Sequence, residues 1–188
     1  MTGPHQVSVV IPVYQGELTL AAVVEELAAS VQVRLSPGGR EYQVAEVLLV
    51  HDCGPDASDD TIRALRAARD WVRPVWLSRN LGPHAATLAG IAASGGEWVA
   101  TMDEDGQHDP DALGALLDTA MDQQADVVYA KPTNEPPHGP LRNLASRGAK
   151  GVVERLTTGA QASDFNSYRL IVGEVARPIA AYARPGTY

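Results

Sequence analysis

The sequence predicts an α/β fold, with a mostly parallel β-sheet covered by helices on both faces. Two observations predict this class. Short apolar runs that are rich in β-branched residues alternate along the chain with segments of helical periodicity. Little sequence lies between them, as expected where each helix returns the chain to a neighbouring parallel strand. Ligands of such open sheets bind beyond the carboxyl ends of the strands, so the polar segments that follow the apolar runs are candidate functional segments.

The first two predicted strands enclose an amphipathic helix. The runs VSVVIPV (residues 7–13) and VAEVLLV (residues 44–50) are short and rich in valine, which is typical of buried strands. The stretch SPGGR (residues 36–40) predicts a turn before the second of them. Between the two strands, apolar residues recur at helical spacing and predict one buried helix face, at Leu20, Val23, Val24, Leu27 and Val31.

A polar loop leads from the second strand into the next helix. The loop is HDCGPDASDD (residues 51–60), and either Asp56 or Ser58 is expected to cap the helix. The run VRPVWLS (residues 72–78) predicts a third strand. Because proline lacks the N–H group that a central strand donates, Pro74 favours an edge position for this strand.

The remaining elements continue the alternation. A loop and then an alanine-rich helix are predicted within residues 80–94, and a strand, EWVATMD, at residues 97–103. The next segment, residues 109–124, predicts a helix with Asp109 as its cap and Pro110 in its first turn. After it we expect a strand at 125–130, a proline-rich loop at 131–140, a helix at 141–159, a strand at 164–172 and a last helix.

Composition narrows the class of protein. With 188 residues and 45% hydrophobic content, the chain suits a single globular domain that folds without a disulfide or a metal. The formal net charge of -8 argues against nucleic acid as a partner, because nucleic-acid binding usually depends on a basic surface. The single cysteine, Cys53, favours a reducing cytoplasmic setting. The polar start MTGPHQ lacks the apolar core of a signal peptide, and no stretch approaches the roughly 20 apolar residues of a membrane span.

The stretch TMDEDGQHDPD (residues 101–111) places several acidic residues at the end of a predicted core strand. In extended chain, Asp103 and Asp105 point the same way, and two carboxylates about 5 Å apart repel by roughly 3 kcal/mol. A divalent cation, Mg²⁺ or Mn²⁺, reverses that sign, and Gln107 offers a further oxygen ligand. The alternative interpretation is a solvated acidic loop before the next helix, the role we expect for Asp109 and Asp111.

Five segments together resemble a known family. In chain order they are SVVIPVYQGE, VHDCGPDASDDT, SRNLGPHAATLAGIAASGGEWVATMDEDGQHDPD, ADVVYAKP and SDFNSYRL. The combination resembles the family 2 glycosyltransferases, which have a GT-A (Rossmann-like) fold. Within that family it is most similar to the dolichyl- or polyprenyl-phosphate sugar synthases and their bacterial relatives. The resemblance covers residues 7–172.

The resemblance implies a site for a nucleotide-diphosphate sugar. The matching nucleotide-sugar-binding positions are Pro12, Tyr14, Glu17, Asp52, Asn80, Gly82 and Asp103. Metal ligands for Mg²⁺ or Mn²⁺ would be Asp103, Asp105 and Gln107. Candidate catalytic residues are Asp105 and Asp164. Basic residues for an acceptor phosphate would be Arg142, Arg147 and Arg169.

Structural roles are the alternative for several of these residues. Asp52 would cap the helix that follows its loop, and residues 80–82 would shape a turn. The two arginines in the predicted 141–159 helix would be ordinary solvated residues, and Arg169 would pair with Asp164.

The chain departs from the family pattern at four positions. His51 stands where the family often has a first acidic residue, and Gly54 stands in place of a serine. Gly106 replaces the leucine of the common DLQ sequence, and Ser167 replaces a second acidic residue of the distal motif. These differences put the base selectivity and the metal geometry in doubt.

We therefore expect a metal-dependent inverting glycosyltransferase that moves a sugar from a nucleotide-diphosphate sugar to a polyprenyl or dolichyl phosphate. Such an acceptor is already anionic, so Asp164 would position metal or acceptor and would not need to remove a proton. The alternatives are a transferase with a hydroxyl acceptor, such as a cell-surface glycan, for which a general base is needed, and a non-catalytic nucleotide-sugar-binding module.

The expected organisation is one catalytic domain over residues 1–188. Residues 1–130 would bind the nucleotide sugar and the metal, and residues 131–188 would form the acceptor side. The resemblance implies a cytoplasmic protein that works at the inner face of the cell membrane when its acceptor is a lipid. Relatives often continue into membrane-associated helices, so a C-terminally truncated chain, a short homologue and a soluble enzyme all stay open, as does the oligomeric state.

Overall fold

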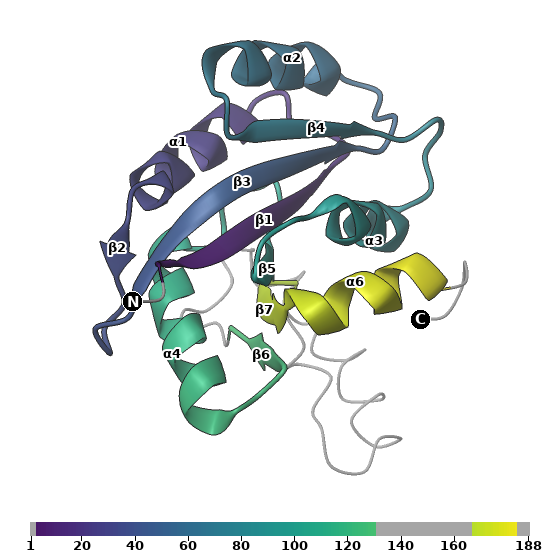
Figure 1. Cartoon of the computed structure of the whole chain (residues 1–188). Coiled ribbons are helices and arrows are strands. Elements are labelled where there is room, and N and C mark those ends of the chain that lie inside the picture. Colours follow the sequence, from purple (N-terminus) through teal and green to yellow (C-terminus); the bar gives the residue numbers. More distant parts are fainter. Residues whose placement is uncertain (1–2, 131–166, 184–188) are drawn as a thin grey trace, which may run out of the picture.

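One curved β-sheet organises residues 3–130 and 167–183, the part of the chain that the computed structural model describes (Figure 1). Its seven strands are β1 (His5–Val13), β2 (Arg34–Leu35), β3 (Glu41–His51), β4 (Val72–Trp76), β5 (Trp98–Thr101), β6 (Val127–Tyr129) and β7 (Arg169–Val172). The helices are α1 (Leu20–Val31), α2 (Ser58–Ala68), α3 (Pro83–Ala93), the 3-10 helix η1 (Pro110–Ala112), α4 (Leu113–Gln123) and α6 (Gly173–Tyr182).

The sheet is mostly parallel, as the sequence predicts. Strands β4, β3, β1 and β5 lie side by side in this order and run parallel, while β7 is antiparallel to both β5 and β6. The short β2 forms an antiparallel pair with the start of β3. Among the described strands β4 pairs only with β3, so Pro74 lies on an edge strand and this prediction is confirmed.

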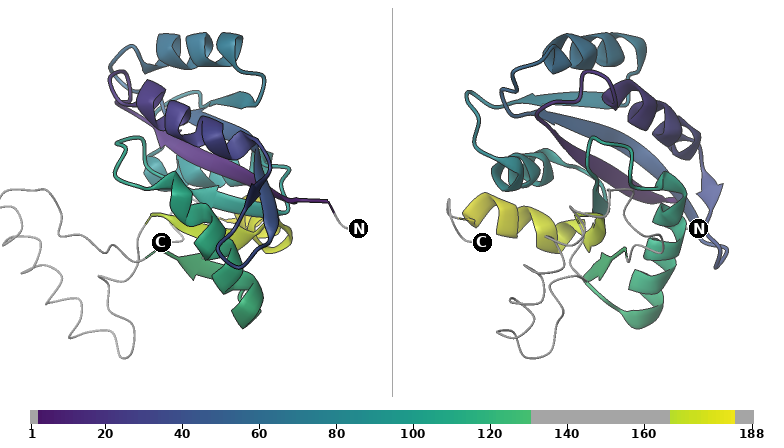
Figure 2. Two further views of the ribbon diagram at one scale, coloured as in Figure 1. Left: turned by 90° about the vertical axis from the view of Figure 1, so that its left-hand side faces the viewer. Right: turned by 180° about the vertical axis from the view of Figure 1, so that it is seen from behind.

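Helices cover both faces of the sheet, which confirms the predicted layers (Figures 1 and 2). On one face, α1, α2 and α4 bury Leu27, Ile62 and Leu117 against the sheet. On the other face, α3 and α6 pack through Ala86 and Ala176. Because both faces are buried, the central strands read as continuous apolar runs and do not alternate between polar and apolar residues.

Two elements differ from the prediction. The sequence pattern did not indicate β2, because a strand of two residues shows too little periodicity. The strand predicted at 97–103 ends at Thr101, and Asp105 lies in a turn. The loop predicted at 131–140 and the helix predicted at 141–159 lie outside the described residues.

The predicted cap of η1 is confirmed, whereas the prediction that Asp56 or Ser58 caps α2 is wrong. Asp109 caps η1, since its Oδ1 accepts a hydrogen bond from the Asp111 N–H at 2.9 Å, and Pro110 follows as predicted. At α2 the cap position itself is Ala57, which makes no side-chain cap bond. Asp56 still contributes there, because its Oδ1 accepts from the Ser58 N–H at 3.2 Å.

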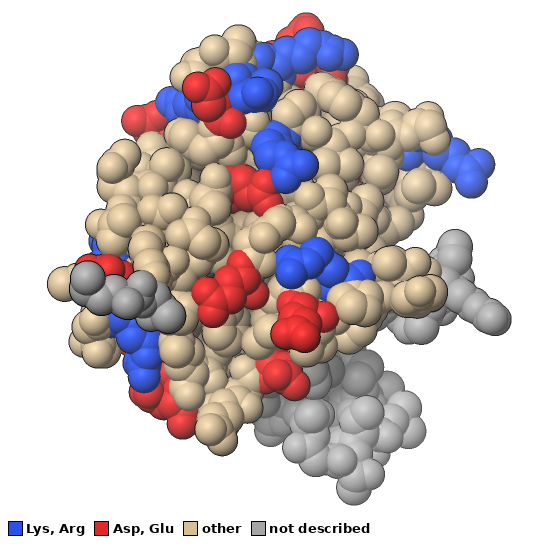
Figure 3. All heavy atoms as spheres, viewed as in Figure 1, with Lys and Arg blue, Asp and Glu red and all other residues tan. Residues whose placement is uncertain are grey.

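The described surface carries mixed charge. Acidic and basic side chains are interspersed over the face shown in Figure 3. On α2, for example, Arg63 pairs with Asp59 at 3.5 Å, and Arg66 pairs with Asp70, just beyond the helix, at 3.6 Å. None of the helices in the described ranges is long and apolar enough to cross a membrane.

Candidate active site

Three polar loops meet beyond the carboxyl ends of β1, β3 and β5. Four successive backbone N–H groups of the first loop, residues 14–17, donate to side chains of the other two loops. The N–H groups of Tyr14 and Gln15 donate to Glu104 Oε2 and Oε1, each at 3.0 Å. Those of Gly16 and Glu17 donate to Ser58 Oγ at 2.9 Å and to Asp56 Oδ2 at 3.0 Å. The predicted gathering of polar loops at one edge of the sheet therefore occurs.

The carboxyls that hold this loop have perturbed pKa values. Burial raises the pKa of Glu104, the N–H groups of Gln15 and Tyr14 oppose that rise, and the negative charges of Asp56 and Asp103 add to it. Burial also acts to raise the pKa of Asp56, but hydrogen bonds from Ser58 and from backbone N–H groups outweigh it and lower that pKa. Glu17 adds a return contact, because its Oε2 accepts from the Ala57 N–H at 3.3 Å.

Asp103 is held at its side chain by one residue and at its backbone by another. Its Oδ2 accepts a hydrogen bond from Ser167 Oγ at 2.5 Å, and its backbone N–H donates to His108 Nδ1 at 3.0 Å. Because a backbone N–H only donates, Nδ1 carries the lone pair and the neutral ring holds its proton on Nε2. That nitrogen lies 3.7 Å from Asp103 Oδ2 and 3.4 Å from Ser167 Oγ.

His108 is itself fixed by a buried tyrosine. The imidazole stacks on the Tyr168 ring, with 5.1 Å between centroids and 21° between planes. The Tyr168 hydroxyl donates to the Asp109 carbonyl at 2.9 Å, and burial raises the pKa of this phenol. Sequence reasoning missed this support of Asp103, because spacing alone does not show which way a loop histidine faces.

Asp105 and Gln107 lie in a tight turn. Asp105 Oδ1 accepts from the Gln107 N–H at 3.0 Å, and Gly106 between them has φ of 72°. Both Asp105 and Gln107 are exposed. The expectation that Asp103 and Asp105 continue one extended strand is wrong, since β5 ends at Thr101 and the chain turns from Glu104 into Gly106, which takes a left-handed conformation.

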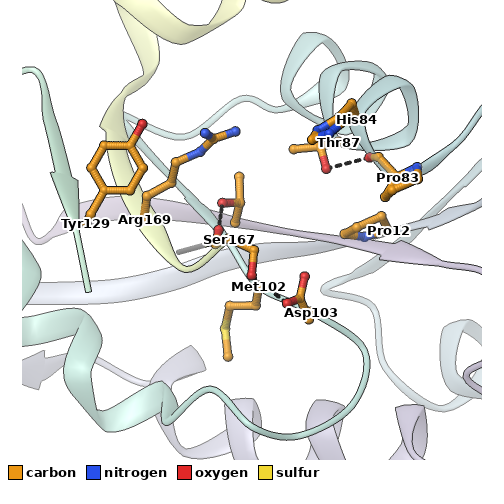
Figure 4. A pocket seen from close by; sticks show the side chains of 10 residues that line it. Pro12, Pro83, His84, Thr87, Met102, Asp103, Tyr129, Ser167 and Arg169 are labelled. Atoms are coloured by element: carbon orange, nitrogen blue, oxygen red, sulfur yellow. Dashed lines mark hydrogen bonds between the residues drawn. The ribbon is translucent and has the colours of Figure 1, made fainter. Parts of the chain in front are cut away.

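A cavity of about 520 Å³ opens beside Asp103 (Figure 4). Arg169 and Tyr129, from β7 and β6, lie on one side of it, and the start of α3 lies on the other. The Arg169 guanidinium lies 6.0 Å from the centre of the Tyr129 ring, and its buried Nε has no hydrogen-bond partner among the described residues. Residues that line the cavity include Pro12, Pro83, Thr87, Asp103, Ser167 and Arg169.

Asp52 orders the loop before α3. It is only 2% exposed, and its Oδ1 and Oδ2 accept from the N–H groups of Leu81 at 2.7 Å and Gly82 at 2.9 Å. Asn80 Oδ1 also accepts from Gly82 N–H, at 3.0 Å, and Gly82 has φ of 87°. Asp52 therefore stabilises the start of α3, whereas the structural alternative was a cap on α2. Its contact with a nucleoside stays a prediction.

The departure HDCG has a steric explanation. A Cβ atom at Gly54 would lie 1.5 Å from the Tyr14 carbonyl oxygen, so a serine does not fit without moving the backbone. Cys53 adopts φ of 51°, and its Sγ donates to the Leu77 carbonyl at 3.0 Å. His51 packs against Trp76, with ring centroids 5.4 Å apart.

The site residues divide into three groups. Arg142, Arg147 and Asp164 lie outside the described residues. Pro12, Asp103 and Arg169 line one cavity. The others lie in the loops around it and are Tyr14, Glu17, Asp52, Asn80, Gly82, Asp105 and Gln107.

The donor atoms present suit a divalent cation of the Mg²⁺ or Mn²⁺ type. Such ions often take one or two carboxylates and complete their shell with water and substrate phosphates. Asp103 and Asp105 supply two carboxylates, and the Asp103 side chain is 43% exposed. Within residues 3–130 and 167–183 no group of three or more His, Cys, Asp and Glu residues could hold a metal.

Comparison with solved structures places the fold among the GT-A glycosyltransferases. Glucosyl-3-phosphoglycerate synthase from Mycobacterium tuberculosis in complex with UDP has a TM-score of 0.61 and 19% identity, over 91% of this chain and 58% of that one. TarS 1-349 from S. aureus in complex with UDP has a TM-score of 0.56 and 21% identity, over 71% and 37% of the two chains.

Sequence comparison identifies the family. The undecaprenyl-phosphate 4-deoxy-4-formamido-L-arabinose transferase of Aeromonas hydrophila is 36% identical over 160 residues, which are 85% of this chain and 46% of the relative. The transferase of that name from Photorhabdus laumondii is 30% identical over 176 residues, 93% and 50% of the two chains. This chain thus spans about half the length of these relatives. The profile of Glycosyl transferase family 2 matches residues 8–182, and the chain belongs to that family.

Proposed function

We propose that the chain is the catalytic domain of an inverting glycosyltransferase that moves a sugar from a nucleotide-diphosphate sugar to a polyprenyl phosphate. The observation that carries this proposal is the cavity that Asp103 and Arg169 share at the carboxyl edge of the sheet. An acidic group on one side and an arginine on the other suit a metal-bound diphosphate and an anionic acceptor. The names of the transferases from Aeromonas hydrophila and Photorhabdus laumondii support this acceptor class.

The metal would be held by Asp103, Asp105 and Gln107. Bound there, Mg²⁺ or Mn²⁺ would act as a Lewis acid toward the leaving diphosphate. The protein's own contribution is orientation: Ser167 and His108 hold Asp103 at the cavity floor, and the Asp105–Gln107 turn holds the second carboxylate.

The nucleoside would bind across the loops that follow β1, β3 and β4. Tyr14 is 41% exposed and presents its ring at this edge, next to Glu17. Pro12 lines the cavity where β1 ends. Asp52 acts through the loop that it holds, where Asn80 and Gly82 lie.

Arg169 would bind the phosphate of the acceptor. Its Nε is buried without a hydrogen-bond partner in the described ranges, and a phosphate oxygen would satisfy it. A phosphate acceptor is already anionic near neutral pH, so orientation by cations serves it better than a general base. Arg142 and Arg147 would complete the phosphate site, and Asp164 would position acceptor or metal.

A hydroxyl acceptor and a non-catalytic sugar-binding module are the other candidates. A hydroxyl acceptor requires a general base within hydrogen-bond reach. The buried Arg169 Nε, which has no hydrogen-bond partner among the described residues, favours an anionic acceptor over it.

A panel of nucleotide-diphosphate sugars, with and without Mn²⁺, tests the proposal. We expect metal-dependent transfer of one sugar to a polyprenyl phosphate and none to a free sugar. Asp105→Asn should abolish turnover, whereas the control Asp70→Asn should not, since Asp70 is a fully exposed acid beyond α2. Binding of a donor without transfer to either acceptor would support the non-catalytic module and overturn the enzyme proposal.

A further inference from the structure

Glu104 lies between the two aspartates of the proposed metal site but faces another loop. Its two carboxylate oxygens each accept one backbone N–H, from Tyr14 and from Gln15, both at 3.0 Å. These N–H groups belong to the loop after β1, where the nucleoside would bind. One side chain therefore links the end of β5 to the end of β1.

Gly16 leaves room for the contact between Glu104 and the loop after β1. A Cβ atom at Gly16 would lie 2.6 Å from Glu104 Oε2, so a larger residue here would displace the carboxylate from its present position. The next two N–H groups, of Gly16 and Glu17, are taken by Ser58 and Asp56. Glu104 therefore accepts two of the four successive N–H groups, and the loop after β3 supplies the acceptors for the other two.

A carboxylate suits this contact, because its two oxygens each accept one of the two neighbouring N–H groups. A glutamine side chain has a single oxygen in place of two, so it could not accept both N–H groups in this paired manner.

We propose that Glu104 is a positioning residue that couples the two parts of the donor site. It holds the 14–17 loop in register with Asp103 and Asp105, so that one rigid unit meets both the nucleoside and the metal-bound diphosphate. The inference rests on the proposed function. It assigns Glu104 no direct contact with the metal or with the reacting atoms.

The coupling predicts different effects of a Glu104 variant on two binding reactions, that of Mn²⁺ alone and that of a nucleoside diphosphate together with Mn²⁺. A variant of Glu104 retains Asp103, Asp105 and the residues that would touch the nucleoside. Binding of Mn²⁺ alone should therefore stay within about twofold of the wild type, because neither metal ligand is altered. Binding of a nucleoside diphosphate together with Mn²⁺ should weaken by on the order of tenfold, the scale of lost orienting contacts around metal sites.

Two measurements on the purified chain test the inference. The first is hydrogen exchange of the backbone amides of residues 14 and 15, which should be faster in Glu104→Ala than in the wild type and intermediate in Glu104→Gln. The second is the Kd of UDP, GDP, CDP, ADP and TDP at saturating Mn²⁺, with the Kd of Mn²⁺ alone measured in parallel. Glu97→Gln is the matched control, because this half-exposed glutamate pairs with His5 away from the site.

The outcomes separate the inference from the proposed function. If none of the diphosphates binds the wild type, the proposed function and the inference both fail. If one binds the wild type and the Glu104 variants equally well, the proposed function stands and the coupling is overturned, even where amide exchange has changed. A weakened Kd for Mn²⁺ alone would make Glu104 a metal ligand and would also overturn it.

Discussion

At the scale of single residues, the carboxylate of Asp103 is the best-supported group of the site. The carboxylate accepts from Ser167 Oγ, and the backbone N–H of Asp103 donates to His108, so both the side chain and the backbone of this residue are fixed. A carboxylate held in one orientation loses less conformational freedom when it binds a cation. Ser167, where the family often has an acid, therefore supplies a hydrogen bond and no extra charge.

Ser167→Ala should weaken metal-dependent binding of a nucleoside diphosphate by about tenfold, since orienting contacts of this kind contribute 10- to 100-fold. Its effect on unfolding should be small because Ser167 is exposed. Calorimetric titration and thermal unfolding measure the two quantities. Thr119→Ala, which removes a hydroxyl from α4, is the control. Equal affinity in the wild type and Ser167→Ala would exclude an orienting role for this hydroxyl.

Two glycines that depart from the family pattern should respond differently when the family residue is restored. Gly54→Ser should lower the free energy of unfolding by about 1–3 kcal/mol or more, because its Cβ would meet the Tyr14 carbonyl oxygen at 1.5 Å. A Cβ atom at Gly106 would meet Val23 Cγ2 at an ordinary contact distance of 3.7 Å, so the main cost of Gly106→Leu should be the strain of φ at 72°, about 1 kcal/mol. Denaturant unfolding of both variants checks the order, and a Gly54→Ser protein as stable as Gly106→Leu would contradict it.

Residue identities could be predicted from the sequence better than their contacts. Asp103 lies at the cavity because it follows an apolar strand, and the apolar run of that strand can be recognised in the sequence. The orientation of Glu104 was not, since it depends on a turn that begins after Thr101. The contact of Asp52 with a nucleoside stays a prediction, whereas its hydrogen bonds to the N–H groups of Leu81 and Gly82 could not be foreseen from the sequence.

At the scale of secondary-structure elements, a buried acid joins three strands. Glu46 of β3 accepts from Ser8 Oγ of β1 at 2.7 Å and from the Gly95 N–H at 2.7 Å, and it also pairs with Arg73 of β4. The bridge fixes β1 and β4 on either side of β3. These are the strands whose carboxyl ends carry the proposed nucleotide-binding loops.

This bridge makes part of the stability dependent on pH. Burial acts to raise the pKa of Glu46, but Ser8, Arg73 and the Gly95 N–H outweigh it, so the folded pKa lies below the ordinary 4.5. Glu46 thus binds a proton less readily when folded. Its contribution is complete above pH 4.5 and is lost as the pH falls through the lower folded value.

Glu46→Gln should therefore flatten the loss of stability in acid. The variant should be less stable than the wild type at pH 7, by about 1–3 kcal/mol for a hydrogen bond to a charged group, and the gap should narrow below pH 4.5. Urea unfolding between pH 3 and pH 7 measures this, with the exposed Glu41→Gln on the same strand as control. A gap that stays constant over this range would show that the Glu46 charge contributes nothing.

Elements were predictable where their pattern is long. The apolar runs of β1 and β3 and the capped start of η1 carry strong signals, and Pro74 correctly marked the edge strand. Whether a strand pairs parallel or antiparallel with its neighbours could not be predicted, because the apolar pattern of a strand is the same for both directions. The antiparallel course of β7, which places Arg169 beside Thr101, follows from tertiary pairing and not from local sequence.

At the scale of the whole molecule, the hydrophobic core and the proposed metal ligands use different residues, and the core residues Met102 and Tyr168 adjoin the site. Apolar side chains fill both sides of the sheet, and the polar loops lie at one edge. The alternation of strands and helices was enough to predict this layout, since it restricts ligands to the carboxyl edge. No described residue of either core cluster is a proposed metal ligand, so folding should not require the cation.

Chelation tests this separation. EDTA alone should leave the unfolding temperature of the free protein unchanged, because the cores form without metal. A nucleoside diphosphate with Mn²⁺, at about 100 times its Kd, should stabilise the folded chain by about 2.7 kcal/mol. For a chain of this size that corresponds to a rise of roughly 5–10 °C. EDTA should reverse the rise, since the diphosphate would depend on the ion that Asp103 and Asp105 hold. A lower unfolding temperature on adding EDTA to the nucleotide-free protein would instead reveal a structural metal. It would contradict the prediction that folding does not require the cation.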